Sequence, residues 1–197
     1  MSEQRITLPK PQVTGSVSLE AAIAQRRSVR RYAPHDLELG QIGQLLWAAQ
    51  GITGGQDTLR AAPSAGACHP LVWYACRDDG IWRYHPENHS LARHAEEDAR
   101  ESLVNVAWRQ QFIAQAPCVF AISVIMERTT GRYGERGEIR YAPMDVGHAS
   151  QNVLLQAVAL GLATVPVGAF DDAAVAKILA LPGQEQPIYL IPVGYPG

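Results

Sequence analysis

Four arginines surround one serine in the stretch RRSVRRY, residues 26–32, and these are the residues with the clearest potential for chemistry. Guanidinium groups bind phosphate through paired hydrogen bonds, and the serine hydroxyl can add another. A fixed cation also stabilises a ring that becomes anionic on reduction. The alternative is structural, because positive charges at a helix C-terminus complement the helix dipole. Composition alone leaves both interpretations open.

Two further segments have the composition of ligand-binding loops. The first, PSAGA at residues 63–67, has small side chains that would let the backbone approach a flat ligand closely. In the second, VPVGAFDD at residues 165–172, Gly168 follows an apolar run, so its amide could face a ligand at a strand end. Each has an ordinary alternative: a turn for the first, and a strand-to-helix connection capped by Asp171 for the second.

Signals for other chemistries are weak or absent. His85, His89 and His94 are spaced loosely like metal ligands, but they straddle a turn and no cysteine or carboxylate completes the set. We therefore predict no metal site. P-loop, Rossmann, zincin and α/β-hydrolase motifs are missing. Cys68 and His69 are adjacent, yet a nucleophilic pair is formed in space and not by sequence adjacency.

The bulk composition limits the class of protein. A chain of 197 residues is expected to form one domain, over residues 19–197, preceded by an extended arm at 1–18. A net charge of -2 argues against nucleic acid or an anionic membrane as a partner. Widely spaced Cys68, Cys76 and Cys118 suggest no disulfide framework, and no signal peptide or membrane span is visible, so we expect a cytoplasmic protein.

The elements that must position these residues mix helices and strands. Helical spacing predicts helices over 19–26, 39–50, 96–116 in two pieces, and 144–162. Strands are predicted on both sides of an Asp79–Gly80 hairpin turn and at 118–126, 163–167 and 188–193, with an Asp-capped helix after 171. Residues 51–67 are expected as a long loop, and residues 127–140 as a charged, mobile segment. Because regular βαβ alternation is missing, we predict an α+β fold with a central, mainly antiparallel sheet flanked by helices.

The predicted helix at 144–162 is apolar on nearly every side and carries small residues at Gly147, Ala149 and Ser150. Such a pattern is typical of a helix that is buried on most sides, in a core or in a subunit interface.

Taken together, these segments resemble the FMN-dependent nitroreductase family, and most closely its subgroup of SagB-type dehydrogenases, which are related to the thiazole- and oxazole-forming peptide oxidases. The resemblance covers residues 19–196. Its motifs, in chain order, are SLEAAIAQRRSVRRY, QIGQLLWAAQGIT, RAAPSAGACHPL, YGERGEIRYAPMDVGHASQNVLLQAVALGLATVPVGAFDD and LPGQEQPIYLIPVGYP.

The resemblance implies a nitroreductase-like fold and an obligate homodimer, with the long helix in the interface and two FMN molecules held between the subunits. NAD(P)H would be the reductant. By motif, Arg26, Arg27 and Ser28 would hold the FMN phosphate and ribityl chain, and Arg30 would lie near the N1/O2 edge of the flavin.

Further cofactor contacts follow from the same resemblance. The other subunit would contribute Pro63, Ser64, Ala65 and Ala67. The ring would be lined by Pro166, Val167 and Gly168, with the Gly168 amide near flavin N5. Weaker candidates on the interface helix are Gln151 and Asn152. The substrate pocket would include His69, Arg140 and Tyr141.

The sequence also departs from the family pattern. His69 stands where relatives often have tyrosine, and Tyr195 stands where they often have arginine after the final PVG. No basic pair follows the last predicted strand, so phosphate binding is expected to depend more on Arg26 and Ser28. Arg140 takes the place of a lysine that azole-forming members are thought to use, and arginine is a poor base.

The resulting functional expectation is an NAD(P)H-dependent flavoenzyme that reduces a small acceptor, such as a nitroaromatic or quinone, by ping-pong hydride transfer. No catalytic acid or base is needed, because the flavin carries the chemistry. Two alternatives stay open: an azoline-to-azole dehydrogenase acting on a modified peptide, and a non-catalytic flavin-binding module.

Overall fold

One antiparallel sheet organises the computed structural model, which describes residues 4–54 and 59–197. Residues 1–3 of the expected arm and 55–58 of the expected loop lie outside the described part. Within it, seven strands are ordered β1-β6-β5-β4-β7-β9-β8 and every neighbouring pair is antiparallel, which confirms the predicted sheet. Their bounds are β1 Arg5–Thr7, β4 Leu71–Arg77, β5 Gly80–His85, β6 Ser90–Ala95, β7 Cys118–Ile125, β8 Ala163–Thr164 and β9 Glu185–Gly194.

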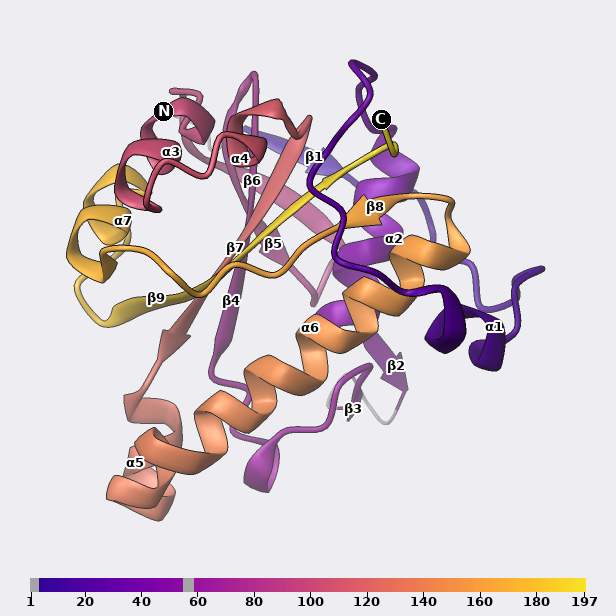
Figure 1. Cartoon of the computed structure of the whole chain (residues 1–197). Helices are drawn as coiled ribbons and strands as arrows, with labels where there is room; N and C mark the ends of the chain where they lie inside the picture. The colour runs from indigo at the N-terminus through magenta and orange to yellow at the C-terminus, as the bar shows by residue number, and fades with distance from the viewer. Residues whose placement is uncertain (1–3, 55–58) are drawn as a thin grey trace.

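Helices cover both faces of this sheet. Their bounds are α1 Leu19–Gln25, α2 Leu39–Gln50, α3 Arg100–Val106, α4 Phe112–Gln115, α5 Glu127–Tyr133, α6 Ala142–Ala159 and α7 Asp172–Ile178. Helices α2 and α6 pack on one face, and α3, α4 and α7 on the other (Figure 1). None of the helices within the described ranges is long and apolar enough to cross a membrane.

The central strands β4 and β7 are buried on both faces because their side chains alternate between two cores. In β4, Trp73 and Ala75 enter the core beneath α2 and α6, whereas Tyr74 and Cys76 enter the core beneath α3 and α7. This two-sided burial explains the near-continuous apolar run of residues 118–126, and the buried strand expected there is confirmed.

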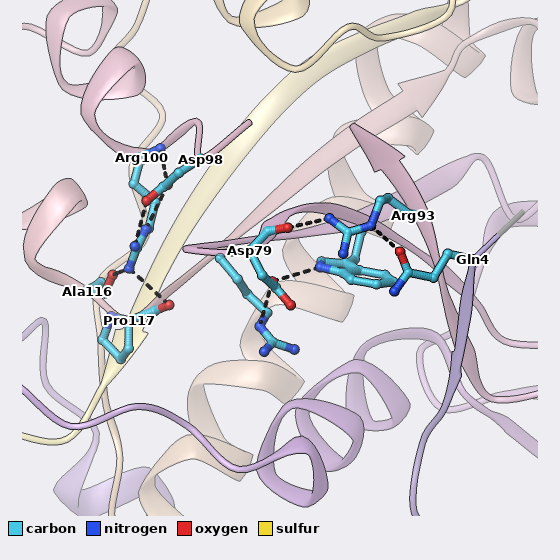
Figure 2. A network of polar contacts seen from close by, with 9 residues as sticks. Gln4, Asp79, Arg93, Asp98, Arg100, Ala116 and Pro117 are labelled. Carbon is cyan, nitrogen blue, oxygen red and sulfur yellow. Dashed lines mark hydrogen bonds and ion pairs between the residues drawn. The ribbon is translucent and has the colours of Figure 1, made fainter. Parts of the chain in front are cut away.

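The predicted hairpin is also confirmed, but its two-residue turn is Asp78–Asp79, because Gly80 already pairs with Arg77 as the first residue of β5. Polar contacts fix its tip (Figure 2). Trp82 Nε1 donates to Asp79 Oδ1 at 2.9 Å, and the Arg93 guanidinium lies 4.2 Å above the Trp82 ring. Arg93 also donates to the Asp79 carbonyl oxygen and, at 2.7 Å, to Gln4 Oε1. A third strand, β6, which the sequence did not indicate, therefore joins the hairpin to the N-terminal arm.

The expectation of a mobile segment at 127–140 is wrong. Residues Glu127–Tyr133 form α5, and Gly137–Tyr141 form a π-helical turn that leads directly into α6. Thr129 is fully buried, and a Cβ at Gly137 would lie 2.6 Å from the Thr129 carbonyl carbon, so only glycine permits this close packing. The charged side chains that suggested mobility lie on the exposed faces of these short helices.

The region expected as a loop at 51–67 holds more regular structure than predicted. Strands β2 (Ile52–Gly54) and β3 (Leu59–Arg60) pair with each other, and a 3-10 turn spans Ala65–Ala67. The long helix predicted at 144–162 is α6, which begins two residues earlier, where Pro143 occupies its first turn.

Candidate functional site

The arginine-rich segment lies beside β8. Ser28 forms a parallel bridge with Thr164, and the Val29 amide donates to the Thr164 carbonyl oxygen at 3.0 Å. The chain then leaves β8, and Val167 exchanges both backbone hydrogen bonds with Leu190 of β9, at 2.8 and 2.9 Å. Two of the sets predicted from sequence, Arg26–Ser28 and Pro166–Gly168, are thus brought to the same edge of the sheet.

Helix α1 delivers the first arginines to this edge. Ser18 caps the helix by accepting from the Ala21 amide at 3.2 Å. Arg27 Nη1 donates to the carbonyl oxygens of Ala24 and Arg26, at 2.9 and 2.8 Å, so it performs the structural role of a basic residue at a helix C-terminus. Arg26 is half-buried and Ser28 is exposed.

Arg30 lies on the exposed side of the same segment, with its guanidinium carbon 5.7 Å from the centre of the Phe112 ring. Next to it, the Tyr32 hydroxyl donates to the carbonyl oxygens of Val29 and Pro192, at 3.1 and 3.2 Å. Burial raises the pKa of Tyr32 well above its ordinary value, so this hydroxyl stays neutral and its hydrogen bonds persist. The segment is therefore held by β8 on one side and by β9 and Tyr195 just after it on the other.

Gly168 presents exposed backbone at the end of this edge, while Val167 is buried. A Cβ at Gly168 would meet only the Tyr189 ring, at 3.6 Å, which is an ordinary contact. The position thus combines an accessible amide with a flat aromatic neighbour.

The predicted loop at 63–67 lies elsewhere, at the N-terminal end of α6. Ser64 Oγ donates to Asp145 Oδ2 at 2.6 Å, and the Ala65 amide donates to Asp145 Oδ1 at 3.3 Å. Ser64 Oγ in turn accepts from the His69 amide at 2.9 Å. Asp145 is only 2% exposed, so this carboxylate holds the loop from inside the protein.

Helix α5 and the π-helical turn close over the same loop. Arg132 Nη1 donates to the Gly66 carbonyl oxygen at 3.1 Å, and Arg128 Nη1 to that of His69 at 2.9 Å. Gly66 has a φ of +57°, and a side chain there would collide with the Tyr133 hydroxyl, so the turn requires glycine.

The residues predicted for the substrate pocket gather at this end. The Tyr141 ring packs edge-on against Tyr133, with 4.8 Å between ring centres, and Arg140 beside it is exposed. His69 is half-buried at the end of the 63–69 segment.

One chain does not bring the two ends together. Helix α1 packs against the C-terminal half of α6, near Leu155, whereas Asp145 lies one turn from its N-terminus. The rise of an α-helix puts about 15 Å between these positions. Figure 1 shows α1 and β8 at one end of α6 and α5 at the other.

The weaker candidates on α6 differ in what they contact. Asn152 Nδ2 donates to the carbonyl oxygens of Ala48 and Ala61, at 3.0 and 3.3 Å, so its side chain serves packing within the chain. Gln151 is exposed. It shares one open face of α6 with Met144, Gly147 and His148, so the helix is not buried on all sides within a single chain.

Tyr195, which stands where relatives often have arginine after the final PVG, accepts a hydrogen bond from Gln41 Nε2 at 2.9 Å through its hydroxyl. Its ring also packs edge-on against His35.

Within the described residues, no group of three or more histidine, cysteine, aspartate or glutamate side chains could hold a metal ion.

Three residues of these two ends were missed by sequence reasoning: Asp145, Phe112 and Tyr189. Asp145 had a usable signal, because it is the only acidic residue in the stretch that forms α6. Phe112 and Tyr189 had none, since their positions depend on how distant segments pack.

Comparison with known proteins assigns the chain to a family. A sequence model of the Nitroreductase family matches residues 23–195, and the chain belongs to that family. A protein of Methanocaldococcus jannaschii, named "Putative nitroreductase", is 44% identical over 184 residues, which cover 90% of this chain and 91% of that protein.

Solved structures agree with this assignment. A "putative nitroreductase" from Ralstonia eutropha JMP134 has a TM-score of 0.89 at 26% identity, covering 98% of this chain and 90% of that one. NADPH:FMN oxidoreductase from Vibrio harveyi, solved with NAD+, has a TM-score of 0.68 and covers 90% of this chain and 68% of that one; at 18% identity it shows the fold alone. The expected nitroreductase-like fold is confirmed.

Proposed function

We propose that this nitroreductase-family oxidoreductase binds FMN between two copies of the chain, accepts a hydride from NAD(P)H and passes it to a small acceptor. The observation that carries the proposal is the pairing of Ser28 with Thr164, which puts the arginine segment beside the Pro166–Gly168 backbone. Among proteins of the same fold, one is named as an NADPH:FMN oxidoreductase, which supports a flavin as the cofactor.

The residues at this edge fit FMN chemically. A phosphate dianion needs cationic and hydroxyl donors, which half-buried Arg26 and exposed Ser28 offer. A flat ring needs backbone that it can approach, and Gly168 has room on its open side. Arg27 has its guanidinium committed to helix carbonyls, so we assign it a supporting role at the phosphate.

Bound FMN would supply hydride acceptance and donation at its N5 atom. Arg30 would stabilise negative charge at the N1/O2 edge, and because guanidinium stays protonated, this support does not vary with ordinary pH. The Gly168 amide would orient N5. These residues bind, orient and provide an electrostatic field, so the proposed mechanism assigns no acid or base to the chain.

A second copy would complete the site. The open face of α6, formed by Met144, Gly147, His148 and Gln151, is the proposed contact between copies. Gly147 at its centre permits close helix approach, and a partner would bring its own Pro63–Ala67 loop toward the arginine segment. In this arrangement residues 19–197 act as one domain, with residues 1–18 as its arm.

The azoline-dehydrogenase alternative, which follows from the SagB-type resemblance, has less support. It requires a base next to a tyrosine before α6, and Arg140 cannot readily release its proton. We therefore favour a small diffusible acceptor.

The test is an anaerobic stopped-flow experiment on purified protein, following flavin absorbance. We expect a yellow protein whose absorbance bleaches with NADH or NADPH and recovers with nitroaromatics or quinones. Protein that stays colourless after incubation with FMN would refute the proposal, whereas flavin binding without bleaching would identify a non-catalytic module. A mass loss of about 2 Da on azoline peptides, the hydrogens removed on oxidation, would favour the peptide oxidase.

A further inference from the structure

A cavity of about 300 Å³ lies where the C-terminal end of α2 meets β3, β4 and β5. Its described lining residues include none of those proposed to bind FMN, and one of them, His69, was predicted for the substrate pocket. The volume equals roughly ten water molecules' share of liquid water, so it can hold a multi-atom ligand.

Three nitrogen donors on the cavity-lining residues have no hydrogen-bond partner within the described ranges: Trp73 Nε1, Gln50 Nε2 and Arg60 Nε. Trp73 is 1% exposed and Gln50 is 4% exposed, so bulk water does not satisfy them. Buried donors are nearly always paired in native proteins, and an unpaired donor is destabilising. Three such donors around one cavity therefore indicate a missing acceptor.

Charge around the cavity favours a negative ligand. Arg60, Arg83 and Arg128 all line it, whereas Glu87 is the only lining carboxylate among residues 4–54 and 59–197. Glu87 is turned outward, with a side chain that is 59% exposed and an oxygen 2.8 Å from His85 Nδ1.

The three guanidinium groups differ in the interactions that they make within the protein. Arg83 lies 3.4 Å from the buried Glu185 carboxylate, and Arg128 bonds the His69 carbonyl oxygen. Among the described residues, the Arg60 guanidinium makes one hydrogen bond, to the Gln50 carbonyl oxygen at 3.4 Å, and its Nε has no partner. Arg60 is therefore the cation most free to bind a ligand.

We propose that this cavity binds a small oxyanion, a molecule that carries a carboxylate or phosphoryl group. The unpaired groups of Trp73, Gln50 and Arg60 are donors, so their complement is a group of several acceptor oxygens, and the surrounding guanidinium groups select for negative charge. His85 Nε2, which is also unpaired among the described residues, donates or accepts according to its tautomer. Trp73 and Gln50 would bind from inside the core, and Arg60 from the side of β3. This anion site is separate from the flavin site.

The experiment measures thermal unfolding and calorimetric binding of the full-length protein, as purified with its flavin, at constant ionic strength. The probes are pyrophosphate for phosphoryl groups and citrate for carboxylates, with chloride as the reference ion. We expect one or both oxyanions to raise the unfolding temperature saturably, with chloride ineffective, and the flavin spectrum to stay unchanged. Stabilisation by pyrophosphate would indicate a phosphoryl ligand, and stabilisation by citrate would indicate a carboxylate ligand.

Three variants locate the site. Arg60→Ala and Trp73→Phe each remove a donor and should weaken oxyanion binding by about tenfold or more. Gln50→Glu is nearly isosteric and puts a carboxylate among the same donors, so it should raise stability without ligand and abolish the oxyanion response. Arg31→Ala, a matched loss of an exposed guanidinium outside the cavity, should change nothing.

Two results would overturn the proposal. If neither oxyanion stabilises the protein more than chloride does, water satisfies the donors. If the oxyanions stabilise Gln50→Glu and Arg60→Ala as strongly as the parent, they bind elsewhere. Both results leave the flavin proposal intact, because FMN absorbance is measured independently.

Discussion

The two ends of α6 hold residues expected to serve one cofactor, but they hold them in opposite ways. At the N-terminal end, buried Asp145 fixes the 63–67 loop through Ser64 and Ala65. At the C-terminal end, the backbone of the arginine segment is fixed to β8, while the Arg30 and Ser28 side chains remain exposed.

This difference suggests different roles for the two ends of α6. The N-terminal end, with Asp145, is a scaffold end that shapes a loop, and the C-terminal end, with the arginine segment, is a ligand-facing end. A carboxylate whose oxygens are bonded within the chain shapes a loop and has little capacity left for a ligand. Exposed guanidinium groups on a rigid backbone are pre-organised for an anion, because they are already held in place and remain accessible to a ligand. Since one chain keeps the two ends apart, their joint use requires two copies.

The largest expected effect comes from blocking the approach of a second copy. Gly147→Arg places a long cation on the open face of α6, where an added side chain meets nothing within 4 Å in its own chain. The chain should fold, yet run as a monomer on size exclusion with light scattering and lose its flavin.

Matched controls make that result specific. Gly147→Ala should keep the dimer and gain about 0.5–1 kcal/mol, since alanine favours helix over glycine. Gly183→Arg adds the same charge at an open position away from α6 and should have no effect. A Gly147→Arg protein that stays dimeric and yellow would remove α6 from the interface.

The next effect concerns the ligand-facing end alone. Arg26→Ala should weaken FMN binding by about 10- to 100-fold, because a charge-assisted hydrogen bond to phosphate is lost, while the unfolding temperature of the apoprotein barely changes. Fluorescence quenching of free FMN measures the affinity. Arg31→Ala is the control, and equal loss in both variants would point to general electrostatics rather than a phosphate contact.

At the scaffold end, a substitution should lower the stability of the fold rather than act directly on FMN affinity. Asp145→Ala leaves the Ala65 amide and the Ser64 hydroxyl without their partner, so we expect a loss of about 2 kcal/mol in the free energy of unfolding. Denaturant titration measures this loss. Glu138→Ala, an exposed acid in the π-helical turn, should cost nothing measurable; equal costs would mean that Asp145 does not anchor the loop.

The smallest effect tests how α1 supports the arginines. Ser18→Ala removes the side-chain cap on the Ala21 amide and should cost about 1 kcal/mol, with FMN affinity falling only slightly. Ser18→Asp retains an acceptor and should restore stability. A large loss of FMN affinity in Ser18→Ala would show that α1 positions Arg26 more directly than its contacts indicate.

Much of this arrangement could be predicted from periodicity and turn chemistry. The β4–β5 hairpin, helix α2 and the buried strand β7 have local signals that the structure confirms. The prediction for residues 127–140 was wrong because their many charged side chains were interpreted as a sign of mobility. A short helix buries only a few of its residues, such as Thr129, and exposes the rest, so a high content of charged residues is compatible with helix.

The candidate site was less predictable because it depends on long-range contacts. Ser28 beside Thr164, and Ser64 bonded to Asp145, involve partners far apart in the chain that no local pattern specifies. The cavity at Trp73 and Gln50 was invisible for the same reason, since both residues look like ordinary core positions in the sequence.

The bond from the Tyr32 hydroxyl to the Pro192 carbonyl oxygen, 160 positions along the chain, also has a kinetic consequence. Closing so long a loop has a large entropic cost, which only the assembled strands β7 and β9 can offset. The arginine segment should therefore dock late in folding, after the central sheet. We expect FMN to bind no collapsed intermediate and to stabilise only the final state, so added flavin should slow unfolding without accelerating refolding.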